Sequence, residues 1–583
     1  MLRRRDVLRQ LTVGVMAAGA LPLLQACGTL TPAAPTAAPA AAPAAASAVF
    51  PTYLPTTSGP KPDYPSSGPQ YEDGFTNYPA NNPQSWTRPA PGSGSKVAIF
   101  AQQRGIGGNT APTPLDQNPA WQEINRQLNA AVAFNISPAG QDYNTKLAAI
   151  MAGSDLPDIM FFQGGIGGTN ATSSTVGASG TSNMPAFMQH SLADLTPYLG
   201  GDAAKDYPNL AAIPTFAWKN SGCAYNGKLY MWPVERYRPL NMLFRNTGIW
   251  DAELGANYIP ANADEFKRVL QQLNRPNENR YAVEGVNIQY NLQVFPAMFG
   301  APNGWALDSQ GKLTRDIETP QYREAVAYVR DLIASGLYHP DFIQNLANAT
   351  STGATQTFAG GHAAVIVYTF GVNWSTLWNT AHAAQPPVDF LPLGLFPAHD
   401  GGKPGHFLGP GFIATNGMKQ ASPDRIKELL RIVDWLAAPF GSQEDLLLTY
   451  GIKDQEYTLD SNLHPVQLPG KAADTQAVPW QYVVQHPQVM FFPNYPDYAR
   501  LEADAEKMLI PAGIEDPTWG LFTPSMGTVG PTIGQLVLDT LTDILVGRRD
   551  VSEYDQMVKD WQTRGGNQLR GELEQAIAGR GPA

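Results

Sequence analysis

Cysteine is scarce in this sequence of 583 residues, which contains only Cys27 and Cys223. A framework of several disulfide bonds is therefore excluded, and the fold must be held together by hydrophobic cores. If Cys27 is modified, as inferred below, Cys223 has no disulfide partner within the chain. We expect Cys223 to be a small buried side chain and not a catalytic thiol.

A surplus of positive charge is also missing. The chain has 39 Lys and Arg against 50 Asp and Glu, which gives a formal net charge of -11 at pH 7. Proteins that bind nucleic acids normally carry a basic surface, so this composition argues against a nucleic-acid partner. The eight histidines are scattered, and His399 and His406 share a loop without the spacing of metal ligands. We therefore predict no metal site.

Motifs of cofactor-dependent and nucleophilic enzymes are absent or incomplete. Residues 105–110 and 165–168 each begin like a dinucleotide-binding glycine motif but lack its last glycine. The sequence contains neither a P-loop nor a Gly-x-Ser-x-Gly motif. We predict no cofactor. A pair of catalytic carboxylates, as in glycosidases, cannot be recognised in one sequence, so an enzyme stays an open alternative.

The first 27 residues have the order of an export signal. Three arginines precede an apolar run over residues 11–24, which is shorter than the roughly 20 residues that span a bilayer. Residues 4–9 resemble the twin-arginine export pattern. Residues 24–27, Leu-Gln-Ala-Cys, resemble a bacterial lipobox. We predict a signal peptide over residues 1–27, lipidation of Cys27 and an extracytoplasmic, membrane-anchored protein; an uncleaved anchor is the alternative.

Residues 28–95 are rich in Pro, Ala, Gly and Ser. Such a composition buries too little apolar surface to offset the entropy lost on ordering, and proline keeps the chain extended. We predict a semi-rigid tether that holds the body at the membrane surface. Tyr71, Phe75, Tyr78 and Trp86 are the residues within it that can pack on the body.

Short apolar runs alternate with amphipathic segments from residue 96 onward. We expect strands at 97–101 and 156–162, and helices at 119–128 and 144–152. This alternation predicts an α/β fold with a parallel sheet. A loop rich in Gly, Ser and Thr follows the second strand over residues 163–183, at the end of the sheet where ligands usually bind.

Turn and cap signals predict further elements. An Asn-Gly pair at 226–227 predicts a hairpin over residues 224–230, because both residues tolerate the positive φ that the turn demands. Asn262 and Ser422 are N-cap residues of helices expected at 262–273 and 423–437. Apolar residues at helical spacing predict three more helices, at 320–335, 534–546 and 551–563.

Several stretches together resemble, in their order and spacing, the solute-binding lipoproteins of bacterial carbohydrate ABC importers. The long branch named for aldouronate or oligosaccharide transport is the most similar, and maltose-binding protein is a broader relative. The resemblance covers most of residues 96–579. It rests on residues 156–162, 225–233, 243–255, 336–340, 358–374 and 542–574.

The resemblance implies a two-lobed α/β fold with a hinge, in which each lobe is built from discontinuous parts of the chain. Lobe 1 would comprise residues 96–233 and 388–437, and lobe 2 would comprise residues 234–387 and 438–583. The lobes would close around a carbohydrate ligand, and a membrane permease would recognise the closed form. The resemblance therefore implies a monomeric receptor that performs no covalent chemistry.

The resemblance also places candidate ligand contacts by position. In the family, ligand-binding residues follow the first strands, lie just beyond the hinge hairpin and precede the closing helices. The corresponding residues here are Gln102, Gln103, Arg104, Phe162, Gln163, Arg236, Tyr237, Asn373, Trp374, Trp519 and Phe522.

The candidate residues depart from maltose-binding protein in one respect. Where that protein has acidic residues after its first two strands, this chain has Gln102, Arg104 and Gln163, so its sugar need not be a maltodextrin. Arg104, Arg236 and Arg238 can form a fork for a carboxylate, which would suit a uronic acid.

Two other functions fit the same signals. One is a surface carbohydrate-active enzyme, either a glycosidase or a lyase, and the other is a peptide-binding receptor of the same architecture. The aromatic candidates Phe162, Trp374 and Trp519 can each be ordinary core residues instead of ligand contacts.

Overall fold

The computed structural model describes residues 48–104, 110–164, 184–342, 352–493 and 495–579. These residues belong to one compact unit, residues 47–583. The predicted signal peptide, Cys27 and the first part of the predicted tether lie outside the described residues, as does most of the loop at 163–183. Among the described residues, no helix is both long enough and apolar enough to cross a membrane.

The first sheet has five strands in the order β3-β2-β4-β15-β7. β2 pairs in parallel with β3 and β4, whereas β15 runs antiparallel to β4 and β7. Four of the five residues of β4 are buried, as expected for an apolar run at the centre of a sheet covered on both faces. The strands are β2 (Lys96–Gln102), β3 (Ala131–Ser137), β4 (Ile159–Gln163), β7 (Met231–Glu235) and β15 (Phe412–Met418).

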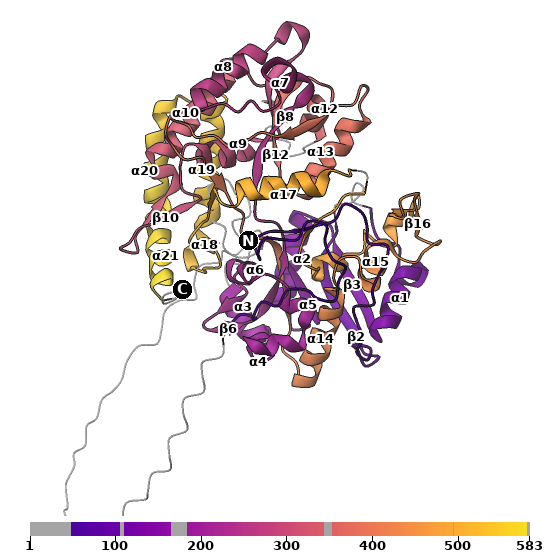
Figure 1. Cartoon of the computed structure of the whole chain (residues 1–583). Helices are drawn as coiled ribbons and strands as arrows, with labels where there is room; N and C mark the ends of the chain where they lie inside the picture. The colour runs from indigo at the N-terminus through magenta and orange to yellow at the C-terminus, as the bar shows by residue number, and fades with distance from the viewer. Residues whose placement is uncertain (1–47, 105–109, 165–183, 343–351, 494, 580–583) are drawn as a thin grey trace, which may run out of the picture. The chain divides into compact units, whose positions relative to one another are not determined.

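Helices on this sheet complete the first core, which contains Trp121, Phe161, Trp218, Trp232 and Trp435. They come from three separate parts of the chain, and α14 and α15 follow the last strand (Figure 1). The helices are α1 (Pro119–Leu128), α2 (Gln141–Ala152), α3 (Met184–Ser191), α4 (Thr196–Leu199), α5 (Pro208–Ala211), α6 (Thr215–Asn220), α14 (Pro423–Leu436), α15 (Gln443–Tyr450) and α16 (Trp480–Val483).

The second sheet has four strands in the order β13-β8-β12-β9. β12 pairs in parallel with β9 and antiparallel with β8, and β8 pairs antiparallel with β13. Side chains of successive strand residues point to opposite faces, so this sheet separates two cores. The strands are β8 (Asn241–Asn246), β9 (Tyr281–Gly285), β12 (Ala363–Thr369) and β13 (Phe390–Pro392).

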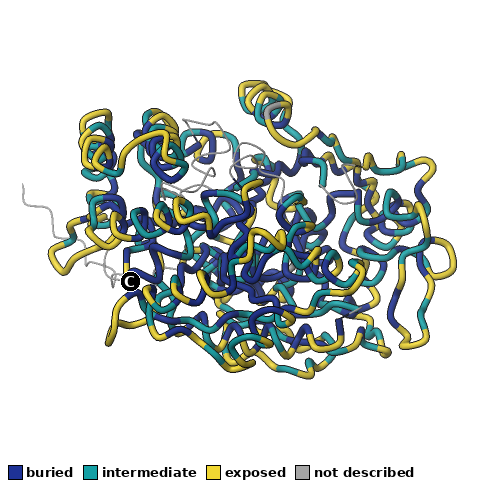
Figure 2. The backbone as a smooth tube through the Cα atoms, turned by 90° about the horizontal axis from the view of Figure 1, so that it is seen from above, coloured by how far each residue is buried: buried dark blue, intermediate teal, exposed yellow. Residues whose placement is uncertain are grey.

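The second core lies on one face of this sheet, where Leu243, Val283 and Val365 point, and the third core lies on the other, with Phe244 and Ile366. Figure 2 shows buried backbone inside the molecule and exposed backbone at its rim. The second core is covered by α7 (Thr247–Leu254), α8 (Ala263–Leu273), α9 (Ile288–Met298), α10 (Pro320–Ala334), α18 (Pro524–Thr528), α19 (Gly530–Leu545), α20 (Tyr554–Trp561) and α21 (Asn567–Gly579). The third core is covered by α12 (Thr352–Ala359), α13 (Val372–Ala383) and α17 (Tyr498–Leu509).

Short elements join these layers. The two-stranded pairs are β1 (Asp73–Gly74) with β18 (Val489–Met490), β5 (Ala224–Tyr225) with β6 (Lys228–Leu229), β10 (Trp305–Leu307) with β11 (Leu313–Arg315), β14 (His406–Phe407) with β19 (Gly513–Ile514), and β16 (Tyr457–Leu459) with β17 (Pro465–Gln467). The 3-10 turns are η1 (Leu115–Gln117), η2 (Asp202–Asp206), η3 (Pro276–Glu278), η4 (Asp316–Glu318), η5 (Lys471–Ala473) and η6 (Val551–Glu553), and η7 (Gln562–Gly566) is a π turn.

The predicted elements are recovered where local signals were strong. α1 has the expected bounds, and Asn262 and Ser422 cap α8 and α14 by accepting hydrogen bonds from backbone N–H groups. The hairpin turn has φ 48° at Asn226 and 72° at Gly227. Strand β4 begins three residues later than expected, at Ile159, because Pro157 precedes it.

The segment from residue 48 to residue 95, called here the N-terminal strap, packs on the body and does not continue the predicted tether. Phe75, Tyr78 and Trp86 are buried, as the sequence suggested, whereas Tyr71 is half-buried. The strap pairs with β18 through β1 and touches α17 through the Glu72 backbone N–H, which donates to Glu506. The tether prediction is therefore too long at its C-terminal end.

Two segments pack elsewhere than the predicted lobe boundaries place them. Residues 390–392, expected in lobe 1, form β13 at the edge of the second sheet. Helices α15 and α16, expected in lobe 2, bury Leu447, Leu448 and Val483 in the first core. Both differences have the same cause, because the apolar side chains of these segments pack against a different sheet from the one expected.

Glu428 of α14 fastens the last part of the strap. Its carboxylate accepts hydrogen bonds from the Ser93 backbone N–H at 2.8 Å, the Ser93 hydroxyl at 2.6 Å and the Ser95 hydroxyl at 2.9 Å, and it pairs with Arg425 at 2.7 Å. Burial alone would raise the pKa of Glu428, but these hydrogen bonds outweigh burial and hold the pKa at about 2.

We predict that Glu428→Gln lowers the free energy of unfolding by about 2 kcal/mol at pH 7, because charged hydrogen bonds become neutral ones. A depressed pKa gives stability that is present above the unfolded-state pKa and is lost as pH falls toward 2. The difference between variant and wild type should therefore shrink between pH 5 and pH 2. Urea unfolding at several pH values measures it, with the exposed Glu278→Gln as control. An equal difference at all pH values would contradict the assignment.

Candidate functional site

The carboxyl ends of three strands of the first sheet bring candidate residues to one edge. Gln102 and Arg104 lie at the end of β2, Gln163 ends β4, and Arg236 follows β7. β2 and β4 are neighbours, and β15 separates β4 from β7. Ligands of open α/β sheets bind at this end of the strands.

Arg104 and Arg236 face one region around Tyr482. The Arg104 guanidinium lies over the Tyr482 ring at 5.6 Å, and its Nη1 donates to the Gln476 carbonyl at 3.2 Å. The Arg236 Nη1 donates to the Glu235 carbonyl at 2.7 Å. Burial, together with the positive charge of Arg236, lowers the pKa of Arg104 to about 10. The two guanidinium groups therefore lie close enough to repel each other.

Neither of these guanidinium groups forms an ion pair with a carboxylate among the described residues. Both side chains are half-buried. Placing two like charges out of water without a counter-ion is costly, and an anion between them would remove the cost. The arrangement thus favours a negatively charged guest.

Glutamates near Arg236 act on it by charge but form no ion pair with it among the described residues. Burial raises the pKa of Glu235, at the end of β7, to about 7, and raises that of Glu506 in α17 to about 8. It also raises the pKa values of Glu72 in the strap and Glu502 in α17 well above their ordinary range, and their mutual repulsion adds to this. Burial therefore weakens the negative charge that these carboxyl groups offer, and the charges of Glu235 and Glu72 offset only part of the cost of burying Arg236, whose pKa stays lowered.

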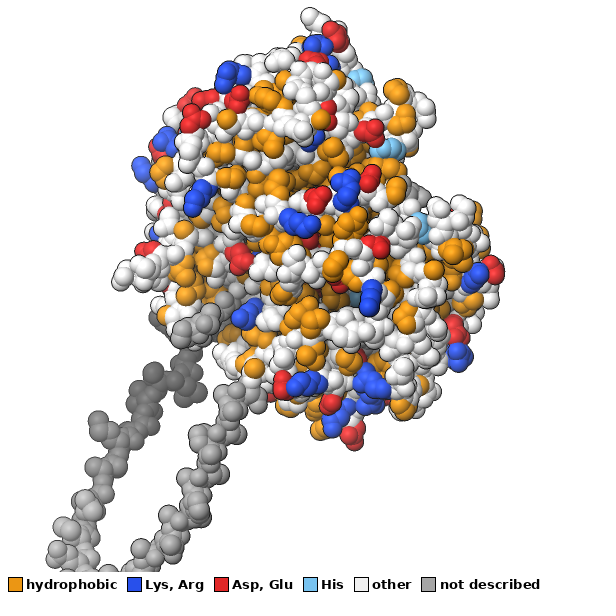
Figure 3. All heavy atoms as spheres, in the orientation of Figure 1, with side chains coloured by type: hydrophobic (Ala, Val, Ile, Leu, Met, Phe, Trp, Pro, Cys, Tyr) orange, Lys and Arg blue, Asp and Glu red, His pale blue; other side chains and the backbone are white. Residues whose placement is uncertain are grey.

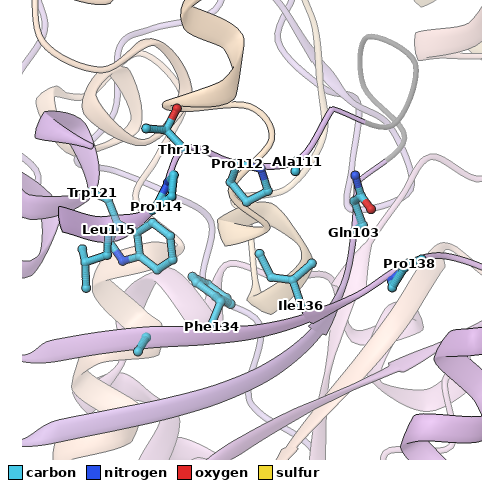
Figure 4. A pocket seen from close by; sticks show the side chains of 11 residues that line it. Gln103, Ala111, Pro112, Thr113, Pro114, Leu115, Trp121, Phe134, Ile136 and Pro138 are labelled. Carbon is cyan, nitrogen blue, oxygen red and sulfur yellow. The ribbon is translucent and has the colours of Figure 1, made fainter. Parts of the chain in front are cut away.

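A cavity of about 460 Å³ adjoins Gln103, the residue before Arg104. Its wall is formed by Trp121, Phe134 and Leu115, with Pro112 and Ile136 above and beside them (Figure 4). The side-chain amide of Gln103 is a polar group at one side of this apolar surface. An aromatic wall with an amide beside it suits a molecule that has both C–H faces and hydroxyl groups.

Three aromatic candidates lie inside cores. Phe162 and Trp374 are fully buried, and Trp519 is 5% exposed. Phe162 packs on the Phe187 ring at 6.3 Å, and Trp374 packs on Phe244 at 5.0 Å. In this arrangement they support the surrounding elements, and none of the three offers a ring face to solvent.

Tyr237 lies just beyond β7 and packs on the third core. Its ring stacks edge-on against Phe370 at 5.6 Å and sits against the backbone of Gly371. A side-chain Cβ at residue 371 would lie 2.1 Å from this ring, and φ there is 70°, so glycine is required. Asn373, two residues on, is half-buried in the first turn of α13.

Arg238 is not available for the carboxylate fork that the sequence suggested. Its side chain is 1% exposed, donates to the Gly409 carbonyl at 2.9 Å and pairs with Glu515 at 2.7 Å. It also lies over the rings of Phe216 and Trp519. The fork is therefore reduced to Arg104 and Arg236, because the third guanidinium is already neutralised within the fold.

The remaining candidates divide between the site and its surroundings. The Gln102 Oε1 is buried without a hydrogen-bond partner among the described residues. Gln163 pairs with Ala414 in the sheet, and Phe522 packs edge-on against Tyr225. Tyr482 and Gln476 were missed in the sequence, because they follow α15 in a stretch with no motif.

Cys223 is fully buried beside the Ser221 hydroxyl, and burial raises the pKa of its thiol.

We predict that Trp374→Ala lowers the free energy of unfolding by about 3–5 kcal/mol, because it opens a cavity in the third core. Urea unfolding measures this loss. Lys219→Ala, which removes an exposed side chain, is the control and should change stability little. Unchanged stability of the Trp374 variant, together with weaker ligand binding, would instead place Trp374 in the ligand site.

We predict that the free energy of unfolding falls as pH rises from about 4.5 to about 8. The unfolded chain releases the protons of Glu506 and its neighbours near pH 4.5, whereas the folded chain retains them until higher pH. Glu506→Gln keeps the carbonyl that accepts from the Glu72 N–H and removes one ionisable group. The variant should be more stable than wild type at pH 8, while Glu278→Gln should not differ. Parallel pH profiles for the Glu506 variant and wild type would refute this prediction.

Comparison with known proteins gives two relatives from Bacillus subtilis. Lipoprotein LipO is 22% identical over 488 residues, which cover 79% of this chain and 89% of that protein. The polygalacturonan/rhamnogalacturonan-binding protein YtcQ is 23% identical over 409 residues, which cover 65% of this chain and 75% of that protein. No protein-family model matches the chain.

Solved structures share the fold over most of their length. An HMO-binding solute-binding protein of Bifidobacterium longum infantis has a TM-score of 0.59 at 13% identity and covers 83% of this chain and 98% of its own. Substrate-binding protein FusA of S. pneumoniae, in complex with kestose, has a TM-score of 0.58 at 14% identity and covers 83% of this chain and 99% of its own. Alginate-binding protein AlgQ2 has a TM-score of 0.54 at 16% identity and covers 85% of this chain and 99% of its own. The chain has the α/β fold of these extracellular solute-binding proteins and is a relative of LipO and YtcQ.

Proposed function

We propose that this chain is the substrate-binding receptor of an ABC importer and captures an acidic oligosaccharide. The observation that carries the proposal is the pair of half-buried guanidinium groups, Arg104 and Arg236, without a carboxylate partner among the described residues. A uronic acid supplies a carboxylate for this pair. Arginine is the best residue for such a group because its planar fork can donate two parallel hydrogen bonds.

The aromatic cavity beside Gln103 supports a sugar over a small carboxylic acid. The half-buried Phe134, against which the buried Trp121 packs edge-on, gives an apolar wall on which the C–H face of a sugar ring can lie. The volume of about 460 Å³ lies within the range of small-molecule sites, so more than the carboxylate itself can be held. The relative YtcQ is named for polygalacturonan and rhamnogalacturonan, whose repeating units are acidic.

We infer that binding works by closure of the two sheets about the passages that join them. One passage runs from β7 to β8 and carries Arg236 and Tyr237. An acidic ligand would relieve the repulsion between Arg104 and Arg236 only when both guanidinium groups contact it. Binding would therefore stabilise the conformation in which both contact the ligand over conformations in which only one does. Its capture is thus a population shift and involves no covalent step.

The proposed setting is the outer surface of a cell membrane. We propose twin-arginine export, cleavage before Cys27 and lipidation of that cysteine, followed by delivery of the sugar to membrane permease subunits. The relative LipO is a lipoprotein by name, which supports the anchored location. A lipid anchor on an extended linker keeps a receptor close to its transporter without embedding the receptor.

We predict that Arg104→Ala and Arg236→Ala each weaken binding of a galacturonate oligomer by about tenfold or more, because a charged hydrogen bond is lost. Binding of the matching neutral galactose oligomer should change much less. Isothermal titration measures both affinities, and Arg268→Ala on the exposed side of α8 is the control. Equal losses for acidic and neutral oligomers would refute carboxylate recognition.

Incubating the protein with the galacturonate oligomer separates the receptor proposal from the enzyme alternative. The oligomer should be recovered at its original length after prolonged contact with the protein. Shortened products would overturn the receptor proposal, and binding of peptides in place of both sugars would favour a peptide receptor.

A further inference from the structure

A second cavity, of about 530 Å³, lies on the first sheet's helices, away from the carboxyl ends of the strands. It is lined by Arg88 of the strap, by Tyr198 and Tyr207 on either side of η2, and by Lys427 and Arg431 of α14. In Figure 3, Lys and Arg side chains gather in the lower part of the view, over α4 and α14, with some acidic side chains between them. We call this cavity the basic pocket.

Two of its cations are not neutralised by the fold. Lys427 is exposed and has no hydrogen bond or ion pair among the described residues. Arg431 donates to the Pro91 carbonyl through Nε at 3.1 Å, which leaves its two Nη groups without a protein partner in the described parts of the chain. The residues are four apart on α14 and therefore lie on the same face of the helix, one turn from each other.

The third cation is engaged, and one acidic side chain opposes the rest. Arg88 pairs with the buried Asp434 at 2.7 Å and donates to the Asp206 carbonyl at 2.7 Å. Asp206 lines the pocket and is exposed to solvent. The unpaired charges of Lys427 and Arg431 outweigh it, so the pocket has a net positive charge.

Two tyrosines add hydrogen-bond donors to the unpaired cations. Tyr207 is buried and Tyr198 is half-buried. Burial raises the pKa of Tyr207 to about 12, so its hydroxyl keeps its proton near pH 7, and the charge of Arg431 acts on the same hydroxyl. An ammonium, a guanidinium fork and phenolic O–H donors together match the oxygens of a phosphate group.

The position of the pocket favours a phosphate that belongs to a lipid. The described chain begins at Ala48, whose backbone lies against Gly200 and Gly201, and the Thr52 hydroxyl donates to Asp202. These residues directly precede the pocket residues of η2. The proposed lipid attachment at Cys27 is about 20 residues before Ala48, a linker that reaches at most roughly 60 Å even when fully extended as polyproline. The pocket therefore lies on the face where the anchored chain enters the body.

We propose that the basic pocket binds the phosphate group of an anionic phospholipid headgroup and so seats the receptor on the membrane surface. This inference rests on the anchored location in the proposed function but not on the identity of the sugar. A headgroup contact would give the tethered body a preferred face toward the bilayer.

The test uses residues 47–583, which form a compact unit with their own hydrophobic cores, so that no lipid or signal peptide contributes. Vesicles of phosphatidylcholine with phosphatidylglycerol are compared with vesicles of phosphatidylcholine alone in a flotation assay. We expect binding to the anionic vesicles only. The double variant Lys427→Glu/Arg431→Glu should bind them at least about 25-fold more weakly, at about fivefold for each basic residue removed.

The control is Arg268→Glu on α8, which makes the same charge change per residue and lies far from α4 and α14 in Figure 1. It should bind vesicles like wild type. Lys427→Glu alone keeps the Arg431 contact to Pro91, so it preserves the test if the double variant fails to fold. Equal weakening by the Arg268 control, or none by Lys427→Glu, would overturn the pocket as the site.

Competition separates the two sources of phosphate. Inorganic phosphate and glycerol phosphate are added to the vesicle assay and are also titrated into the free protein. Binding of inorganic phosphate by a protein that ignores anionic vesicles would overturn the lipid assignment. Galacturonate affinity is measured on the same variants and should not change, so failure here is distinct from failure of the receptor proposal.

Discussion

Two positive charges that the fold leaves without a partner dominate the candidate site. Arg104 and Arg236 come from the ends of different strands, meet around Tyr482 and repel each other. A protein that needed only stability would place a carboxylate between them, as it does for Arg238 with Glu515. Since half-buried charge is costly without a counter-ion, this arrangement lowers stability, and the proposed acidic ligand would remove that cost.

The buried glutamates beside Arg236 fit this constraint. Glu72 comes from the strap, Glu235 from the end of β7, and Glu502 and Glu506 from one face of α17. If these groups were ionised, they would supply the missing negative charge and compete with an acidic ligand. Burial instead keeps much of their proton in place near neutral pH. The junction therefore places acids whose pKa values are raised beside arginines, which weakens the negative charge near Arg236 at neutral pH.

The sequence predicted those parts of the structure that short-range signals determine. Caps at Asn262 and Ser422, the turn at 226–227 and the stripe of α10 depend on neighbours within a few residues. The location of α15 and α16 in the first core depends on which distant surface accepts Leu447 or Val483, and no local pattern encodes that. For the same reason, the neighbourhood of Arg104 and Tyr482 could not be read from the sequence, and the sequence placed Trp374 at the ligand, whereas the structure buries it in the third core.

The N-terminal strap touches both of the layers that a closing receptor would move. It is hydrogen-bonded to Glu428 on α14, next to the first core, and to Glu506 on α17, next to the third. A rotation of one sheet relative to the other must therefore slide β1 along β18 or lift one end of the strap. The first residues of the strap are also held on the first layer, because the Thr52 hydroxyl donates to Asp202 and the Leu54 backbone N–H donates to the Ala211 carbonyl. A pull on the N-terminal end of the strap would therefore load the first layer before it reached β1 and the joint between the two sheets.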